Sequence, residues 1–158
     1  MRKIIVATAI LFHAMTGSAQ EIPVIKFGQL KEIIESKEKE ILVVNFWATW
    51  CGPCVKELPM FDSLHVQRPE VKVTLVSLDF ADKIDRVRAF VLRKRMSVPS
   101  VLLDEIDYNS WIDKVDPSWE GALPATLIVN TKTGKRKFIA KELEEGQLNE
   151  LINQLLKG

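Results

Sequence analysis

Apolar residues along the chain follow two patterns, continuous runs typical of buried strands and a three-to-four-residue spacing typical of helices. The clearest run, residues 41–47, is apolar except at Asn45 and predicts a strand covered on both faces. The helical spacing is clearest over residues 51–67, which directly follow it. Further strands are predicted at residues 22–27, 71–78, 100–103, 125–129 and 136–139. Further helices are predicted at residues 30–39, 82–95 with Asp82 as N-cap, 108–115 and 148–155.

The order of these elements predicts the fold class. Strands and helices alternate in the first part of the chain, which is typical of a parallel β-α-β arrangement. The strands at 125–129 and 136–139 are joined by a short turn containing Gly134 and predict a hairpin, followed by a terminal helix. We therefore expect an α/β fold in which a mixed central sheet carries helices on both faces.

The N-terminus has the pattern of an export signal. Arg2 and Lys3 form a basic start, residues 4–12 are apolar, and residues 17–19 are the small residues that signal peptidases accept. We predict a signal peptide over residues 1–19, cleaved near Ala19, and a periplasmic location. A membrane span needs about 20 apolar residues, and this apolar run ends earlier; an uncleaved membrane anchor is the alternative.

Residues 20–158 have a length that suits one domain with its own core. Without Arg2 and Lys3, the 22 basic residues fall to 20, against 21 acidic residues, so the net charge is near −1. This balance gives no indication of nucleic-acid binding. Separately, we expect the protein to be a monomer.

The only two cysteines, Cys51 and Cys54, stand between the predicted strand at 41–47 and its following helix. A disulfide over so short a loop adds little stability, so the pair points to redox reactivity. A structural zinc site needs more ligands than these cysteines and His65, the only histidine after residue 19, provide. A c-type haem attachment would need histidine where Val55 stands. We therefore expect neither metal nor cofactor.

These motifs resemble the thioredoxin superfamily, specifically its exported TlpA/ResA-like thiol-disulfide oxidoreductases. The similarity rests on Phe-Trp-Ala at 46–48, Trp-Cys-Gly-Pro-Cys at 50–54, Glu-Leu-Pro at 57–59 and Leu-Pro-Ala-Thr at 123–126. It covers roughly all of residues 20–158 and implies a thioredoxin fold. Residues 96–121 stand where that branch carries an insertion before the cis-proline loop.

The two cysteines have different expected roles. At the start of the helix, Cys51 should be exposed, and the helix N-terminus should favour its thiolate as the attacking sulfur. Cys54, one turn further, should be buried and resolve the mixed disulfide. The resemblance implies that Glu57 handles protons, with an ordinary surface glutamate as the alternative. Cytosolic thioredoxins carry a buried aspartate where Asn45 stands, and an amide cannot titrate.

A client-binding groove is expected beside the cysteines. Pro124 is inferred to be cis and to face them, which leaves the backbone of Leu123 free to pair with an extended client segment; a trans proline that begins a strand is the alternative. Trp50 should border the groove, Gly52 should leave the sulfur approachable, and Pro53 should stiffen the turn.

Two charged regions receive no site assignment. The acidic segment at 96–121 with its two tryptophans could shape partner choice or form a solvated cap whose tryptophans pack on the sheet. The basic helix at 82–95 is most simply a solvated face.

By resemblance, the expected function is reduction of disulfides in exported client proteins, including apocytochromes, with electrons from a membrane thiol donor. The sequence leaves two alternatives open. One is an oxidase or isomerase that forms disulfides in clients, and the other is a binding or chaperone module with an incidental cysteine pair.

Overall fold

The computed structural model describes residues 21–157, so the predicted signal peptide lies outside the described residues. Its strands are β1 (Val24–Ile25), β2 (Ile41–Trp47), β3 (Val71–Ser77), β4 (Ser100–Leu103), β5 (Ala125–Asn130) and β6 (Arg136–Ile139). Its α-helices are α1 (Phe27–Glu35), α2 (Gly52–Gln67), α3 (Ile84–Lys94), α4 (Ile112–Val115) and α5 (Gln147–Lys157). Within residues 21–157, none of the helices has both the length and the apolar character to cross a membrane.

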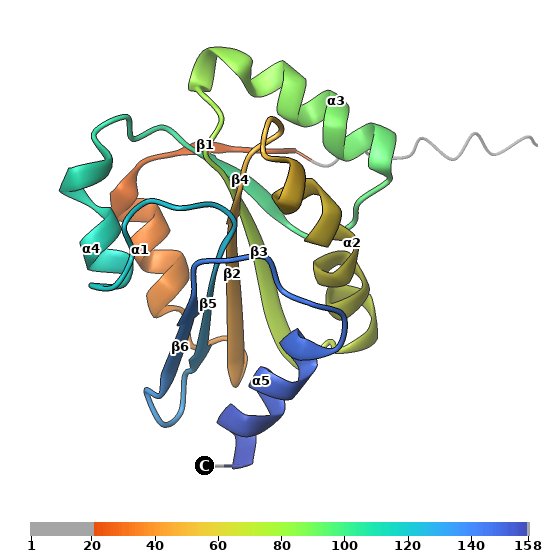
Figure 1. The fold of residues 1–158 in the computed structure, drawn as a ribbon, viewed down its shortest axis with the longest axis vertical. Coiled ribbons are helices and arrows are strands. Elements are labelled where there is room, and N and C mark those ends of the chain that lie inside the picture. Colours follow the sequence, from red (N-terminus) through yellow and green to blue (C-terminus); the bar gives the residue numbers. More distant parts are fainter. Residues whose placement is uncertain (1–20, 158) are drawn as a thin grey trace, which may run out of the picture.

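The strands form one six-stranded sheet in the order β1-β4-β3-β2-β5-β6 (Figure 1). The pairs β1–β4, β4–β3 and β3–β2 are parallel, whereas β2–β5 and β5–β6 are antiparallel. The predicted hairpin is confirmed, and Gly134 adopts φ 75° in its turn, a value that costs glycine little. The mixed sheet is therefore the predicted one.

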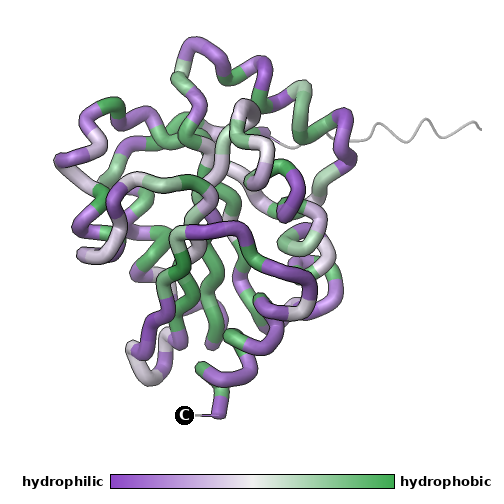
Figure 2. The backbone as a smooth tube through the Cα atoms, in the orientation of Figure 1, coloured by the Kyte–Doolittle hydropathy of each residue, from purple (hydrophilic) through white to green (hydrophobic). Residues whose placement is uncertain are grey.

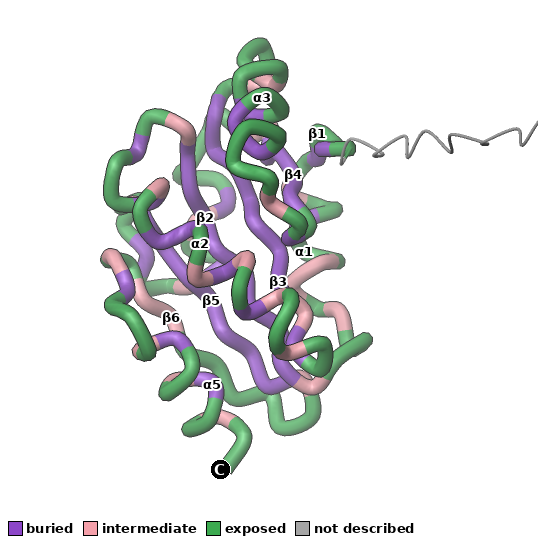
Figure 3. The backbone as a smooth tube through the Cα atoms, turned by 90° about the vertical axis from the view of Figure 1, so that its right-hand side faces the viewer, coloured by how far each residue is buried: buried purple, intermediate pink, exposed green. Residues whose placement is uncertain are grey.

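Helices cover both faces of this sheet. Side chains of α2, α3 and α5 share one apolar cluster with the sheet, while α1 and α4 pack against the other face. Figure 1 shows α2 and α5 on one side and α1 and α4 on the other. Hydrophobic residues concentrate in the strands (Figure 2), which form a buried layer behind the exposed helices (Figure 3). The expected two-sided α/β architecture is confirmed.

Strand β2 lies in the interior of the sheet, and all seven of its residues are buried. Alternate side chains point to opposite faces. Val43 and Trp47 belong to the cluster beneath α2, whereas Val44 and Phe46 belong to the cluster beneath α1. Asn45 lies between Val43 and Trp47 in this alternation, which places a polar side chain in the apolar layer under α2.

The segment at 96–121 is built into the fold. Strand β4 pairs with both β1 and β3, so it is an interior strand. Trp111 and Trp119 are 1% and 3% exposed, and their rings lie 6.2 and 4.6 Å from that of Phe46. The expectation that the tryptophans pack onto the sheet is correct.

Two local predictions are wrong. Asp82 does not cap α3, because it lies within a 3-10 turn, Ala81–Lys83, and its carboxylate pairs with the Lys83 ammonium at 2.7 Å. The turn takes up the first residues of the predicted helix. The helix predicted at 108–115 is divided into a 3-10 turn, Tyr108–Ser110, and α4, because the buried Trp111 between them adopts φ −142°.

Two other elements have different limits from those predicted. The strand predicted at 22–27 is confined to Val24–Ile25, the two residues that pair with β4. The helix predicted at 30–39 begins earlier, at Phe27, and ends at Glu35.

Candidate redox site

Cys51 and Cys54 form a disulfide at the N-terminus of α2, with their Cα atoms 5.2 Å apart. Cys51 is the N-cap residue, and its sulfur accepts a hydrogen bond from the backbone N–H of Cys54 at 3.3 Å. Gly52 and Pro53 are the first helical residues, where the missing N–H of proline costs nothing. Because free N–H groups and the helix dipole converge there, negative charge on the Cys51 sulfur is favoured once the bond is reduced.

The two cysteines differ in surroundings less than expected. Cys54 is fully buried, as predicted, but Cys51 is only 7% exposed, so the prediction of an exposed Cys51 is wrong for the disulfide form. Its sulfur is bonded to that of Cys54, and both residues belong to the apolar cluster under α2. Gly52 and Pro53 are exposed, and Trp50 is 60% exposed. The solvent-accessible surface around the disulfide is therefore formed by Trp50, Gly52 and Pro53 and not by the sulfur atoms.

Asp79, which the sequence analysis missed, fixes the loop that leads into the cysteines. Its carboxylate accepts hydrogen bonds from the backbone N–H of Thr49 at 2.9 Å, the Thr49 hydroxyl at 2.6 Å and the Ser77 hydroxyl at 2.8 Å. Asp79 is 3% exposed. An acidic residue just after a strand that pairs in parallel with β2 was the available signal, since the ends of such strands meet at one edge.

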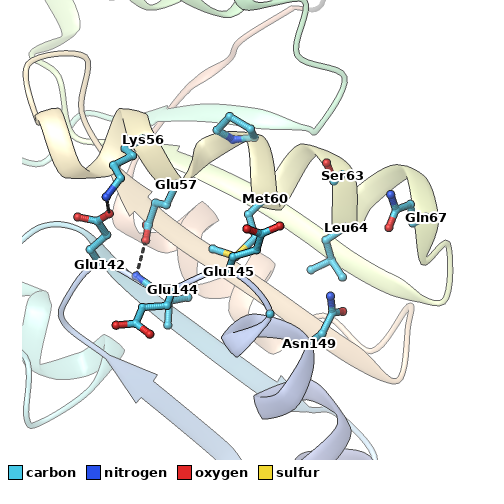
Figure 4. Close-up of a pocket in the computed structure, with 13 residues that line it drawn as sticks. Lys56, Glu57, Met60, Ser63, Leu64, Gln67, Glu142, Glu144, Glu145 and Asn149 are labelled. Atoms are coloured by element: carbon cyan, nitrogen blue, oxygen red, sulfur yellow. Dashed lines mark hydrogen bonds and ion pairs between the residues drawn. The ribbon is translucent and has the colours of Figure 1, made fainter.

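Glu57 lies one turn beyond Cys54 on α2 and is only 4% exposed, so the surface-glutamate alternative is wrong. One carboxylate oxygen, Oε1, accepts a hydrogen bond from Asn45 Nδ2 at 2.8 Å. The other, Oε2, accepts one from the backbone N–H of Leu143 at 2.9 Å. Figure 4 shows Glu57 pointing from α2 toward the segment that carries Glu142 and Glu144.

Burial raises the pKa of the Glu57 carboxyl above its usual value. The hydrogen bonds from Leu143 and Asn45 oppose this shift, because they stabilise the ionised form, and the negative charge of Glu142 adds to it. The net direction is upward. A carboxyl with a raised pKa exchanges its proton closer to neutral pH than an exposed glutamate, which suits proton transfer to and from thiols.

Asn45 connects Glu57 with the first residues of β5. Besides Glu57, its Nδ2 lies 3.0 Å from the hydroxyl of Thr126 and 3.4 Å from the carbonyl oxygen of Ala125. Asn45 and Thr126 face each other across the antiparallel pair of β2 and β5. Through Asn45, the structure connects Glu57 of α2 with Ala125 and Thr126 at the start of β5, which are far from it in the sequence.

The peptide bond between Leu123 and Pro124 is cis, as inferred from the sequence. Pro124 is buried, and Leu123 packs on the same apolar cluster as both cysteines. The backbone of Leu123 has no hydrogen-bond partner among residues 21–157. These features suit the predicted pairing with an extended client segment, and that role stays a prediction.

A pocket of about 700 Å³ lies between α2 and the chain that precedes α5 (Figure 4). Glu57 forms part of its wall, so solvent in the pocket reaches the immediate neighbourhood of this carboxyl. An ion pair of 2.6 Å between Lys56 and Glu142 spans one end. The remaining lining residues are Pro59, Met60, Ser63, Leu64, Gln67, Leu143, Glu144, Glu145, Gly146 and Asn149. Within residues 21–157, no three histidine, cysteine or acidic side chains are placed to hold a metal.

Comparison with known proteins agrees with this geometry. The family model described as Thioredoxin matches residues 21–109. The thiol-disulfide oxidoreductase ResA of Bacillus thuringiensis subsp. konkukian (strain 97-27) is 32% identical over 132 residues, 82% of this chain and 69% of the relative. ResA of Bacillus subtilis (strain 168) is 25% identical over 131 residues, 83% of this chain and 69% of the relative.

Solved structures show the same fold. A thioredoxin-related protein from Neisseria meningitidis serogroup B superposes with a TM-score of 0.67 at 26% identity, covering 79% of this chain and 91% of that one. StoA from Bacillus subtilis superposes with a TM-score of 0.55 at 26% identity, covering 73% and 85% of the two chains. With a family model matched over more than half of its length, a ResA relative at 32% identity and a cysteine pair at the start of α2, the chain belongs to the thioredoxin family.

Proposed function

We propose that the protein is an exported thiol-disulfide oxidoreductase that reduces disulfides of client proteins. The observation that carries this proposal is the Cys51–Cys54 disulfide at the N-terminus of α2, with the buried carboxyl of Glu57 one helical turn behind Cys54. The relatives named thiol-disulfide oxidoreductase ResA support the reaction class. Export rests on the signal-peptide pattern of residues 1–19.

The reaction starts from the reduced pair. The Cys51 thiolate attacks one sulfur of a client disulfide, a mixed disulfide forms, and the other client sulfur leaves as a thiolate. Cys54 then attacks the Cys51 sulfur, which re-forms the Cys51–Cys54 disulfide and releases the second client thiolate. Two electrons pass to the client, and the two protons from the protein's thiols balance the two client thiols formed. A membrane thiol donor of two electrons completes the cycle.

Glu57 has its proposed part in the second step. Cys54 is buried, so its thiol must lose a proton before it can attack, and its burial disfavours the thiolate. Glu57 accepts this proton and passes it to solvent through the pocket whose wall it forms. In this role Glu57 acts on resolution and leaves the first attack by Cys51 to the helix N-terminus.

Client binding is proposed at the surface around the disulfide. The backbone of Leu123, which has no hydrogen-bond partner among residues 21–157, pairs with an extended client segment beside Pro124 and the exposed Trp50. Gly52 and Pro53 leave an approach to Cys51. Apocytochromes, whose haem-attachment cysteines must be reduced, are the client class that the ResA-like resemblance implies.

The test is a trapping experiment with disulfide-containing protein substrates such as insulin. The variant Cys54→Ser should accumulate a mixed disulfide through Cys51, because the resolving sulfur is absent. The matched variant Cys51→Ser should neither trap nor reduce. If Cys51→Ser keeps the full cellular activity, a thioredoxin-fold binding module replaces the redox proposal.

A further inference from the structure

The side-chain amide of Asn45 has an uneven set of partners. Its nitrogen, Nδ2, carries two hydrogens and lies within 3.0 Å of two acceptors, Glu57 Oε1 and Thr126 Oγ1. Its oxygen, Oδ1, is buried and has no hydrogen-bond partner in the part of the chain that the structure describes. A buried, unpaired carbonyl oxygen costs free energy. The hydrogen bonds that Nδ2 donates must therefore stabilise this orientation of the amide by more than the unpaired Oδ1 costs.

The present orientation fits an ionised Glu57. A carboxylate only accepts hydrogen bonds, and Asn45 Nδ2 and the Leu143 N–H both donate to it. A protonated Glu57 would instead need an acceptor for its O–H. Turning the Asn45 amide by half a revolution exchanges Nδ2 for Oδ1 at the same place and provides that acceptor. The Thr126 hydroxyl can accept from Nδ2 or donate to Oδ1, so it fits both orientations, whereas the carbonyl oxygen of Ala125, 3.4 Å from Nδ2, only accepts and favours the present one.

We propose that Asn45 is a positioning residue for proton transfer: its amide holds the Glu57 carboxylate through Nδ2 and, after turning, holds the carboxylic acid through Oδ1. This inference rests on the proposed function, in which Glu57 accepts and releases a proton and must therefore be held in place in both protonation states. An aspartate at this position would place a second carboxylate beside the first, and the two groups would share their titration. The amide leaves the proton on Glu57 alone.

Within residues 21–157, the charged or titratable groups near Glu57 come from two elements. On the side of the segment before α5 stands Glu142, which is ion-paired with Lys56, and Glu144 and Glu145 line the same pocket. On its own helix, Cys54 lies one turn away and is held in the disulfide. From the sheet, Asn45 and Thr126 are neutral hydrogen-bond partners. A change of Asn45 therefore alters the hydrogen bonding of Glu57 without altering any charge around it.

The test is a carboxyl carbon NMR titration of Glu57 in the oxidised protein, where no turnover is needed. Asn45→Ala should raise the pKa of Glu57 by about one unit, a tenfold tighter proton binding, because the lost bond to the carboxylate is roughly twice as strong as one to the neutral acid. The matched control is Thr126→Val, which removes a partner of the same amide and should leave the midpoint of Glu57 in place. Asn45→Val replaces the alanine variant if that variant does not fold.

A second signal in the same titration tests the turning of the amide. In the wild-type protein, the side-chain NH₂ resonances of Asn45 should move with the midpoint of the Glu57 carboxyl. An unchanged Glu57 midpoint in the Asn45 variant, or Asn45 resonances that do not follow it, would overturn the inference. Because the oxidised protein is used, either result is independent of whether Glu57 serves in turnover, which the kinetics of Glu57→Gln decide separately.

Discussion

Replacing Glu57 by glutamine removes the carboxyl proton carrier while keeping the size of the side chain. In the structure two donors, Asn45 Nδ2 and the Leu143 N–H, point at the two carboxylate oxygens from 2.8 and 2.9 Å. The glutamine oxygen accepts from the Leu143 N–H, and its NH₂ group donates to Asn45 once that amide has turned. Two hydrogen bonds to a charged group become neutral ones, each weaker by about 1 kcal/mol, and this loss is offset in part because no ionised carboxyl is buried.

The expected kinetic effect is larger and specific to one step. A positioned acid or base contributes roughly 10²–10⁴-fold, so resolution of the mixed disulfide by Cys54 should slow by at least about 100-fold. Attack by Cys51 on a substrate disulfide should keep its rate, because the N-terminus of α2 favours its thiolate without Glu57.

The assay is stopped-flow fluorescence in single turnovers, with Trp50 beside Cys51 as the reporter. The matched control is Glu145→Gln, which removes a carboxylate from the same pocket and should leave resolution near the wild-type rate. Equal resolution rates in Glu57→Gln and the wild-type protein would refute the proton-transfer role. An equal slowing of both steps would refute the assignment of Glu57 to resolution.

Three further predictions concern stability. Because the pKa of Glu57 is raised, the folded state binds this proton more tightly than the unfolded state does. In denaturant titrations, the wild-type free energy of unfolding should therefore fall relative to that of Glu57→Gln as pH rises through the folded-state pKa, by about 1.4 kcal/mol for each unit by which the folded-state pKa exceeds the unfolded-state pKa. A difference between the two proteins that stays constant with pH would contradict this. Asp79→Ala should cost roughly 3 kcal/mol and speed hydrogen exchange at Thr49, whereas protected exchange would argue against the clamp. Trp119→Ala should cost about 3–5 kcal/mol, since its ring packs on Phe46 in the core; a loss below about 1 kcal/mol would contradict this packing.

Strands β2, β3 and β5 were predictable because they are largely apolar runs of six or seven residues. Strand β2 has the predicted limits, and β3 and β5 differ from prediction by one residue each. Strand β1 was overestimated, because only two of its residues find a partner in β4. The false cap at Asp82 arose because a sequence pattern does not distinguish a helix start from a 3-10 turn that precedes it.

The contacts within the site were less predictable than its residues. Both cysteines, Glu57 and Pro124 stand in recognisable motifs, but the hydrogen bond between Asn45 and Glu57 joins a strand to a helix. It depends on how far α2 is rotated and shifted over the sheet, which residue spacing does not determine. The burial of Cys51 was missed for a similar reason, since it depends on the disulfide and on the packing of neighbouring residues.

The reduction potential of the Cys51–Cys54 pair decides the direction of electron flow between the protein and its clients. The purified mature protein would be equilibrated with a thiol redox buffer and its free thiols counted. If the protein reduces its clients, the value should lie near or below about −250 mV, in the range of reductants such as thioredoxin. A value near about −120 mV would contradict this direction and would make the protein an oxidant that forms disulfides in its clients.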